Sequence, residues 1–167
     1  GIIVSSACQS GEIAEHLLAD DLDGARAVAE WYGDVFKDRY YLEVQAHAAG
    51  NQRVLNERVL HLAHTTGLPV IATNDAHFLR AEDHDAHDVL LCIGLKRDRA
   101  DADRLRYDRG LYFKSAAEVA AEFPGRDDVL ANTVRIADAV NVTFRKKYFL
   151  PAFPLPQGVT SENDLLV

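Results

Sequence analysis

The sequence predicts an α/β protein. Three short apolar segments, at residues 2–4, 40–44 and 68–73, have the composition of buried strands. The segments between them repeat apolar residues at helical spacing and are long enough to form crossover connections. Parallel pairing of the three strands is therefore favoured, either within a barrel or within an open sheet.

The first strand and two helices open the chain. Ile2-Ile3-Val4 is expected to be a buried strand that ends at Ser5-Ser6. A short helix is predicted over 12–18, with Ser10 as its N-cap. Apolar residues at helical spacing predict a second helix over 22–36.

The middle of the chain repeats this order of elements. A strand over 40–44 is followed by an amphipathic helix over 51–66, which Gly67 is expected to end. The continuous apolar run of 68–73 is typical of a parallel strand that helices cover.

The second half has no further strand signal. Gly94 is expected to end one helix, and Ser115 and Glu118 have the spacing of a capping box at the start of another. Helices are predicted over 83–93, 115–123 and 128–140, with a charged loop over 96–109. The Pro-rich segment 150–156 predicts an extended linker toward a further part of a protein.

Composition limits the classes of function. Hydrophobic residues make up 48% of the 167 residues, which is typical of a globular chain. The net charge of −8 excludes a primary nucleic-acid clamp, because phosphate contacts require a basic face. No membrane-spanning stretch and no signal peptide is recognisable. Two cysteines make no disulfide framework, so the reducing cytoplasm is expected.

Asp75-Ala76-His77, directly after the third strand, is the strongest candidate for chemistry. In an extended backbone residues i and i+2 project to the same side, so a carboxylate and an imidazole would point to one place. Active sites of α/β proteins lie at such strand ends. The alternative is that Asp75 caps a turn and His77 is an ordinary loop residue.

The other two strand ends also carry polar groups. Cys8 follows the first strand, and Glu43, Gln45 and His47 stand at i, i+2 and i+4 on the second. Thiolate, imidazole and carboxylate are ligands for zinc or a similar metal, which could activate water and offset the charge of a phosphate. The alternatives are a small buried Cys8, a Glu43 that faces solvent or an arginine, and a His47 in a loop.

The remaining histidines and the second cysteine carry weaker signals. His84 and His87 have a spacing that suits metal binding, although packing at the surface or core edge is favoured. Cys92 lies in an apolar run and is expected in the core. Exposure to solvent is expected for His16, His61 and His64.

Segments 2–13, 41–47 and 72–78 together resemble a known family, the α subunits of bacterial replicative DNA polymerase III (C-family polymerases). The resemblance continues in the same order through residues 86–93, 130–133 and 148–154. It therefore covers essentially the whole chain.

The resemblance implies the C-terminal part of a PHP (polymerase and histidinol phosphatase) domain, a distorted (β/α)7 barrel, followed by short helices and a Pro-rich linker. The implied division is a partial barrel at 1–110, its helical end at 111–147 and a linker toward the polymerase palm at 148–167. Such domains hold divalent metal ions, usually zinc with magnesium or manganese as alternatives, at the carboxyl ends of their strands. The resemblance implies metal ligation by Cys8, Asp75 and His77, with Glu43 and His47 near the site.

One part of the family pattern is missing. The opening His-x-His motif and the ligands that follow it would lie before Gly1, so the three ligands present cannot rebuild the full cluster. The chain has no Met and opens on Ile2-Ile3-Val4, which favours residues upstream that have been cut away over a processed terminus. The fragment alone is expected to be inactive.

The function implied is that of a part of the catalytic α subunit, with a PHP metal site for 3′→5′ exonuclease proofreading. The partners implied are the rest of the α subunit, a DNA primer-template and other replisome subunits. Two alternatives remain: a non-catalytic scaffold within the polymerase, and a stand-alone PHP phosphoesterase. The segments at 130–133 and 150–156 argue against the second, because a stand-alone enzyme needs no linker to a palm.

Overall fold

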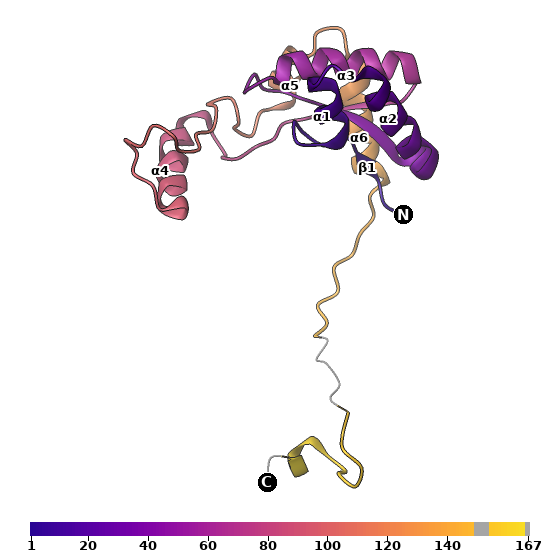
Figure 1. Cartoon of the computed structure of the whole chain (residues 1–167), viewed down its shortest axis with the longest axis vertical. Coiled ribbons are helices and arrows are strands. Elements are labelled where there is room, and N and C mark those ends of the chain that lie inside the picture. Colours follow the sequence, from indigo (N-terminus) through magenta and orange to yellow (C-terminus); the bar gives the residue numbers. More distant parts are fainter. Residues whose placement is uncertain (149–153, 166–167) are drawn as a thin grey trace.

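The computed structural model describes residues 1–148 and 154–165. A sheet and the helices packed on it form one body, and α4 lies apart from this body (Figure 1). The chain that follows α6 leaves the body as an extended segment (Figure 1). The described residues thus include three parts: the α/β body, a lobe made by residues 79–110, and an extended segment over residues 140–148.

The sheet of the body has three parallel strands in the order β1-β2-β3. They are β1 (Val4–Ser5), β2 (Tyr40–Gln45) and β3 (Val70–Thr73). Val4 pairs with Tyr40 across the first ladder, and Glu43 pairs with Ile71 across the second. The prediction of an α/β protein with a parallel sheet is confirmed, and the described strands form an open sheet.

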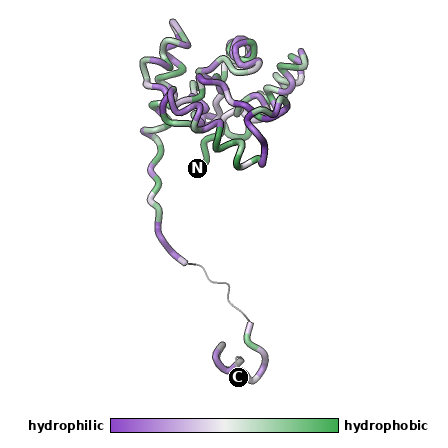
Figure 2. Tube along the Cα trace, turned by 90° about the vertical axis from the view of Figure 1, so that its left-hand side faces the viewer, coloured by the Kyte–Doolittle hydropathy of each residue, from purple (hydrophilic) through white to green (hydrophobic). Residues whose placement is uncertain are grey.

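The first strand differs from its prediction. It is Val4–Ser5 rather than 2–4, it is only half-buried, and Ile2 is 68% exposed. The hydrophobic N-terminal stretch lies at the periphery of the body (Figure 2). The prediction was wrong because β1 pairs on one side only, and an apolar composition alone does not distinguish an edge strand from a central one.

The helices α1 (Glu12–Leu18), α2 (Leu22–Phe36) and α3 (Gln52–Thr66) lie within one residue of their predicted bounds. The Asp21 carboxylate caps α2 by accepting a hydrogen bond from the Gly24 amide at 2.9 Å. Gly67 ends α3 at φ 72°, as predicted.

The N-cap of α1 is Gly11, not Ser10. The Gly11 amide closes a turn onto the Cys8 carbonyl at 2.9 Å. A Cβ at Gly11 would collide with the Ser6 carbonyl oxygen, so the tight turn requires glycine there. The turn shifts the start of the helix by one residue, and Ser10 lies exposed before it.

The core lies between one face of the sheet and the helices α1, α2 and α3. On β2 the alternation is strict at first: Tyr40, Leu42 and Val44 are buried, whereas Tyr41 and Glu43 are half-buried on the opposite face. Adjacent residues of a strand point to opposite faces. The face that carries Glu43 is therefore the one turned away from α1, α2 and α3.

The helix α6 (Asp127–Ala139) packs along β3. The Asn132 side-chain amide donates to the Val70 carbonyl at 2.8 Å, and the Thr133 hydroxyl donates to the Ala72 carbonyl at 3.0 Å. These carbonyls point away from β2, because the β2 amides bind the alternate carbonyls of β3. Side chains of α6 thus bind the edge of β3 where a fourth strand would pair.

The helix α5 (Ala116–Glu122) begins with the predicted capping box of Ser115 and Glu118. The Tyr112 hydroxyl donates to Glu118 at 2.6 Å, and the Ser115 hydroxyl donates to it at 2.7 Å. These hydrogen bonds lower the pKa of Glu118 from 4.5 to about 2, and the bond from Tyr112 contributes most.

The depressed pKa of Glu118 predicts an acid-sensitive helix start. A carboxyl with a lowered folded-state pKa stabilises the fold above its unfolded pKa, and this stabilisation is lost as the pH falls through the folded pKa. We therefore expect amide protection in α5 to hold above pH 4.5 and to be lost as the pH falls toward about 2. Hydrogen exchange of the α5 amides, followed across this pH range, measures the loss of protection. Glu118→Gln should remove the dependence, and an unchanged profile in that variant would contradict the assignment.

The lobe contains the short helix η2 (Ala81–Asp83) and α4 (His84–Leu95). The predicted end of α4 at Gly94 was wrong: the helix continues through Gly94 to Leu95, and its C-cap Lys96 adopts φ 53°. Gly94 lies on the exposed side of the helix, where the lack of a side chain costs no packing. A glycine marks a helix end only where the backbone turns left-handed.

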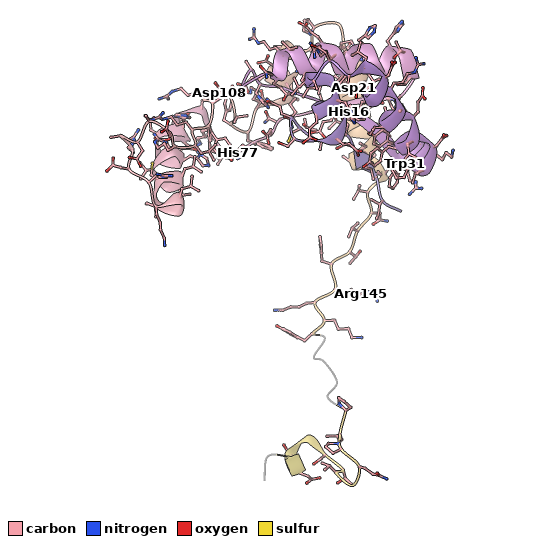
Figure 3. The ribbon with its side chains drawn as sticks, viewed as in Figure 1. His16, Asp21, Trp31, His77, Asp108 and Arg145 are labelled. Atoms are coloured by element: carbon pink, nitrogen blue, oxygen red, sulfur yellow. The ribbon has the colours of Figure 1, made fainter. Side chains whose placement is uncertain are left out.

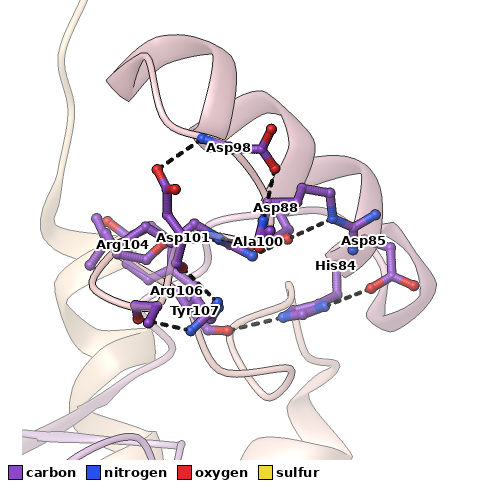
Figure 4. Close-up of polar contacts among 12 residues, drawn as sticks. His84, Asp85, Asp88, Asp98, Ala100, Asp101, Arg104, Arg106 and Tyr107 are labelled. Atoms are coloured by element: carbon purple, nitrogen blue, oxygen red, sulfur yellow. Dashed lines mark hydrogen bonds and ion pairs between the residues drawn. The ribbon is translucent and has the colours of Figure 1, made fainter.

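Polar contacts fix the loop 96–110 against α4 (Figure 4). The Arg104 guanidinium binds both oxygens of Asp88, with the second contact at 2.8 Å. This hydrogen bond keeps the pKa of Asp88 below its ordinary value. The predicted burial of Cys92 in α4 is confirmed. At the base of the lobe, Phe78 and Tyr112 form a parallel bridge.

The predicted tail lies partly outside the described residues, since 149–153 and 166–167 are not described. Residues 140–148 have no helix or strand, and a short helix η3 (Glu162–Leu165) follows near the end. No helix in the described ranges combines the length and the apolar character needed to cross a bilayer.

Candidate metal centre

The candidate site lies at the carboxyl ends of the strands, as parallel pairing requires. Cys8 follows β1, Glu43 lies on β2, and Asp75 and His77 follow β3. His77 lies where the body meets the lobe that contains α4 (Figure 3). The site is therefore positioned between two parts of the molecule.

Asp75 and His77 are neighbours, as their spacing predicts. One oxygen of Asp75 lies 3.4 Å from His77 Nε2, and the other lies 3.8 Å from His47 Nε2. A tetrahedral shell with bonds of about 2.0–2.1 Å separates its ligand atoms by about 3.3 Å. The Asp75–His77 pair therefore has the spacing and the donor chemistry of two zinc ligands.

His47 is held by hydrogen bonds at both ring nitrogens. Nε2 donates to the Gln45 side-chain oxygen at 3.0 Å, and Nδ1 accepts from the Ala49 amide at 3.2 Å. The pKa of His47 lies below its ordinary value. Burial is the main cause, the nearby Asp75 carboxylate opposes it, and Lys114 lowers the pKa further. This tautomer is neutral, and neither nitrogen is free to bind a metal. His47 thus supports the site rather than supplying a ligand.

The described residues do not assemble a complete coordination shell. Within residues 1–148 and 154–165, no three His, Cys, Asp or Glu side chains are arranged to hold a metal ion together. Cys8 is a free, half-buried thiol. The Asp75–His77 pair fits part of a coordination shell, and the described chain alone does not complete it.

Glu43 is close to the candidate ligands in the fold but is bound to hydroxyl groups. It accepts hydrogen bonds from Ser5 Oγ at 2.5 Å and from Thr73 Oγ1 at 2.6 Å. The Gln45 side-chain amide adds a longer contact at 3.4 Å. Neither alternative considered from the sequence, solvent or an arginine, describes its partners.

Two contacts near the site have no signal in the sequence. The ring of Tyr107 stacks on His77, with centroids 4.0 Å apart and planes 25° apart. The Lys114 ammonium donates to the Ala46 carbonyl at 2.7 Å. Both residues come from segments far along the chain, so only the tertiary fold brings them to the strand ends.

The structure gives contacts for the histidines whose sequence signals are weaker. His87 packs beside Phe78 and Tyr107, with ring centroids 5.4 Å from each, and His84 hydrogen-bonds the Tyr107 carbonyl at 3.0 Å. The expectation that both pack rather than bind metal agrees with this arrangement. His61 and His64 are exposed, as predicted. His16 is half-buried and bonds Asp21 at 2.7 Å, so it is less solvated than expected.

Known proteins match the chain along nearly its full length. DNA polymerase III subunit alpha of Pseudomonas aeruginosa is 40% identical over 171 residues, covering 99% of this chain. The same subunit of Pseudomonas fluorescens is 38% identical over 98% of the chain, and that of Thermus aquaticus is 36% identical over 99%. The chain belongs to the bacterial DNA polymerase III α subunit family. It spans about 14% of the length of each of these relatives.

The PHP domain family matches residues 1–47 of this α-subunit segment. The matched part includes β1, the Cys8 turn, β2 and His47. Asp75 and His77 follow beyond it, on the strand that pairs with β2. The sheet register thus links the matched PHP residues to the Asp-x-His pair.

Proposed function

We propose that this chain is part of the catalytic α subunit of a bacterial DNA polymerase III, acting in the cytoplasm, and forms the C-terminal part of its PHP domain. The observation that carries the proposal is the position of Asp75 and His77 at the carboxyl edge of a parallel sheet, within a sequence that matches α subunits almost end to end. The partners proposed are the rest of the subunit, a DNA primer-template and other replisome subunits.

The edges of the sheet support a larger barrel. Asn132 and Thr133 of α6 bind the outer carbonyls of β3, whereas β1 pairs on one side only. Further strands of a distorted (β/α)7 barrel would therefore join at β1. The extended course of residues 140–148 supports a linker toward the polymerase palm.

The proposed ligands from this chain are Cys8, Asp75 and His77, and the proposed metal is zinc, with magnesium or manganese as alternatives. A bound divalent ion would supply an activated water and would offset charge on the phosphodiester of a mispaired 3′ end. The chain's own part is to orient the ligands: Asp75 stands beside His77, and Tyr107 stacks on the His77 ring. Groups other than the described residues would have to complete the shell.

The test uses full-length α subunit that carries Asp75→Asn or His77→Gln. We expect both variants to lose bound metal and degradation of a mispaired 3′ end, while primer extension persists, because polymerisation depends on a separate palm. Metal content is measured by mass spectrometry and exonuclease activity on labelled DNA. His64→Gln, an exposed histidine on α3, is the matched control. Unchanged metal content and exonuclease activity would overturn the catalytic role.

A scaffold without catalysis is the second candidate. The observation that favours it is that the described residues assemble no group of three metal ligands. In that case full-length protein would bind no metal at this site, and both substitutions would leave every activity unchanged. The same experiment therefore separates the two functions.

A further inference from the structure

The two turns that carry the candidate ligands are both strained. Ala7, directly before Cys8, has φ 62°, and Asp75 has φ 49°. Residues other than glycine seldom adopt these left-handed conformations, because the Cβ atom crowds the backbone, and the cost is larger for Ala7 than for Asp75, since Asp tolerates them better. Such conformations persist only where the surrounding structure holds them. Something must therefore hold the ends of β1 and β3 in place.

Glu43 lies between these two strand ends. It is on the central strand, and its two oxygens accept hydrogen bonds from Ser5 Oγ of β1 at 2.5 Å and from Thr73 Oγ1 of β3 at 2.6 Å. Short O–H···O⁻ bonds of this kind are among the stronger hydrogen bonds in proteins. The Glu43 amide also donates to Ser6 Oγ at 2.9 Å. One residue thus joins all three strands at their carboxyl ends.

The residues that Glu43 binds directly precede the strained turns. Ser6 is followed by Ala7 and Cys8, and Thr73 is separated from Asp75 by one residue. Both oxygens of Glu43 are already occupied by hydroxyl donors on the face of the sheet turned away from α1, α2 and α3. Its influence on the ligands therefore passes through the backbone of β1 and β3.

We propose that Glu43 is a positioning residue that sets the spacing between the Cys8 turn and the Asp75–His77 turn by binding Ser5 and Thr73. This inference rests on the proposed function, because it assigns to Glu43 the alignment of ligands within that same site. In the alternative role, Glu43 itself faces a metal with its charge. That role predicts that loss of the charge alone weakens metal binding.

Glutamine and leucine separate the two roles. A hydroxyl group both donates and accepts, so a glutamine side chain can accept from one hydroxyl through its oxygen and donate to the other through its amide. Glu43→Gln therefore keeps the two links without the charge, whereas Glu43→Leu removes both. A positioning role tolerates the first change and not the second.

The experiment uses metal-free, full-length α subunit and peptide-resolved hydrogen exchange. We expect Glu43→Leu to raise exchange in segments 5–10 and 73–77 by roughly tenfold, the effect of losing a net hydrogen bond. Glu43→Gln should stay within about twofold of the unchanged protein. Glu15→Leu, on the exposed side of α1, is the matched control and should leave both segments unchanged.

Single substitutions of the hydroxyl donors give a directional readout. Ser5→Ala should loosen segment 5–10 alone, and Thr73→Val should loosen segment 73–77 alone. A general loss of stability would raise exchange in both. Uniform loosening, or a Glu43→Leu variant that exchanges like the unchanged protein, would overturn the inference.

Zinc titration of the same variants keeps the inference separate from the proposed function. Zinc should bind the Glu43→Gln variant as it binds the unchanged protein and should bind the Glu43→Leu variant more weakly. Loss of zinc from Glu43→Gln with normal exchange would assign Glu43 to the metal instead of to positioning. If the unchanged protein binds none of zinc, magnesium and manganese, the proposed metal site fails, and the exchange pattern still decides whether Glu43 aligns the turns.

Discussion

Leu42→Ala is expected to lower the free energy of unfolding by about 2–5 kcal/mol, the usual cost of truncating a fully buried leucine. Leu42 is 0% exposed, lies on the central strand and faces the core helices. Its neighbours are held by strand pairing on both sides of β2, so they cannot collapse easily into the cavity. Urea denaturation followed by tryptophan fluorescence measures the change.

Leu90→Ala provides the matched control for that experiment. The substitution is the same, but Leu90 lies on α4 and is 63% exposed. Exposed positions away from special contacts change stability by about 0.5 kcal/mol or less. A Leu42→Ala variant as stable as Leu90→Ala would show that the sheet face does not form the core described above.

Asn132→Leu is expected to have the second largest effect on stability. The substitution keeps the branching at Cγ, although leucine is bulkier, and removes the amide that binds the Val70 carbonyl at 2.8 Å. A buried carbonyl without a partner costs about 1–3 kcal/mol. We expect a lower melting temperature and faster hydrogen exchange in β3, because α6 then loses one of its two side-chain hydrogen bonds to the outer edge of β3.

The neighbouring Thr133 tests the same edge with a different group. Thr133→Val removes the hydroxyl that binds the Ala72 carbonyl, and Thr133→Ser keeps it. The valine variant should be destabilised and the serine variant less so. If Asn132→Leu and Thr133→Val both leave the protein as stable as before, the outer edge of β3 is satisfied in another way.

Much of the fold was predictable because local signals and tertiary packing agree. The bounds of α2 match their prediction because Asp21 caps the helix and because its buried apolar residues face the core. The errors arise where packing decides. Ile2 is apolar yet exposed at an edge, and Gly94 stands within α4 although glycine commonly ends helices. Neither distinction is encoded in residue type alone.

The candidate site was predictable only in its local part. Asp75 and His77 are neighbours as predicted, but the backbone that joins them is a turn with Asp75 at φ 49° and not the extended strand on which the prediction relied. The hydroxyl partners of Glu43 and the Tyr107 ring on His77 come from other segments of the chain. Spacing along a sequence contains no information about such neighbours until strand order and register are known.

The parallel bridge between Phe78 and Tyr112 joins the two points at which the chain enters and leaves the lobe. The His77 amide binds the Leu111 carbonyl at 2.8 Å, and the Phe113 amide binds the Phe78 carbonyl at 3.0 Å. The chain therefore departs into residues 79–110 and returns at adjacent points. A segment anchored in this way can be lengthened, shortened or exchanged as a cassette without moving β3, and the change would reach the site through Tyr107 and His87, whose ring centroids lie 4.0 and 6.2 Å from that of His77.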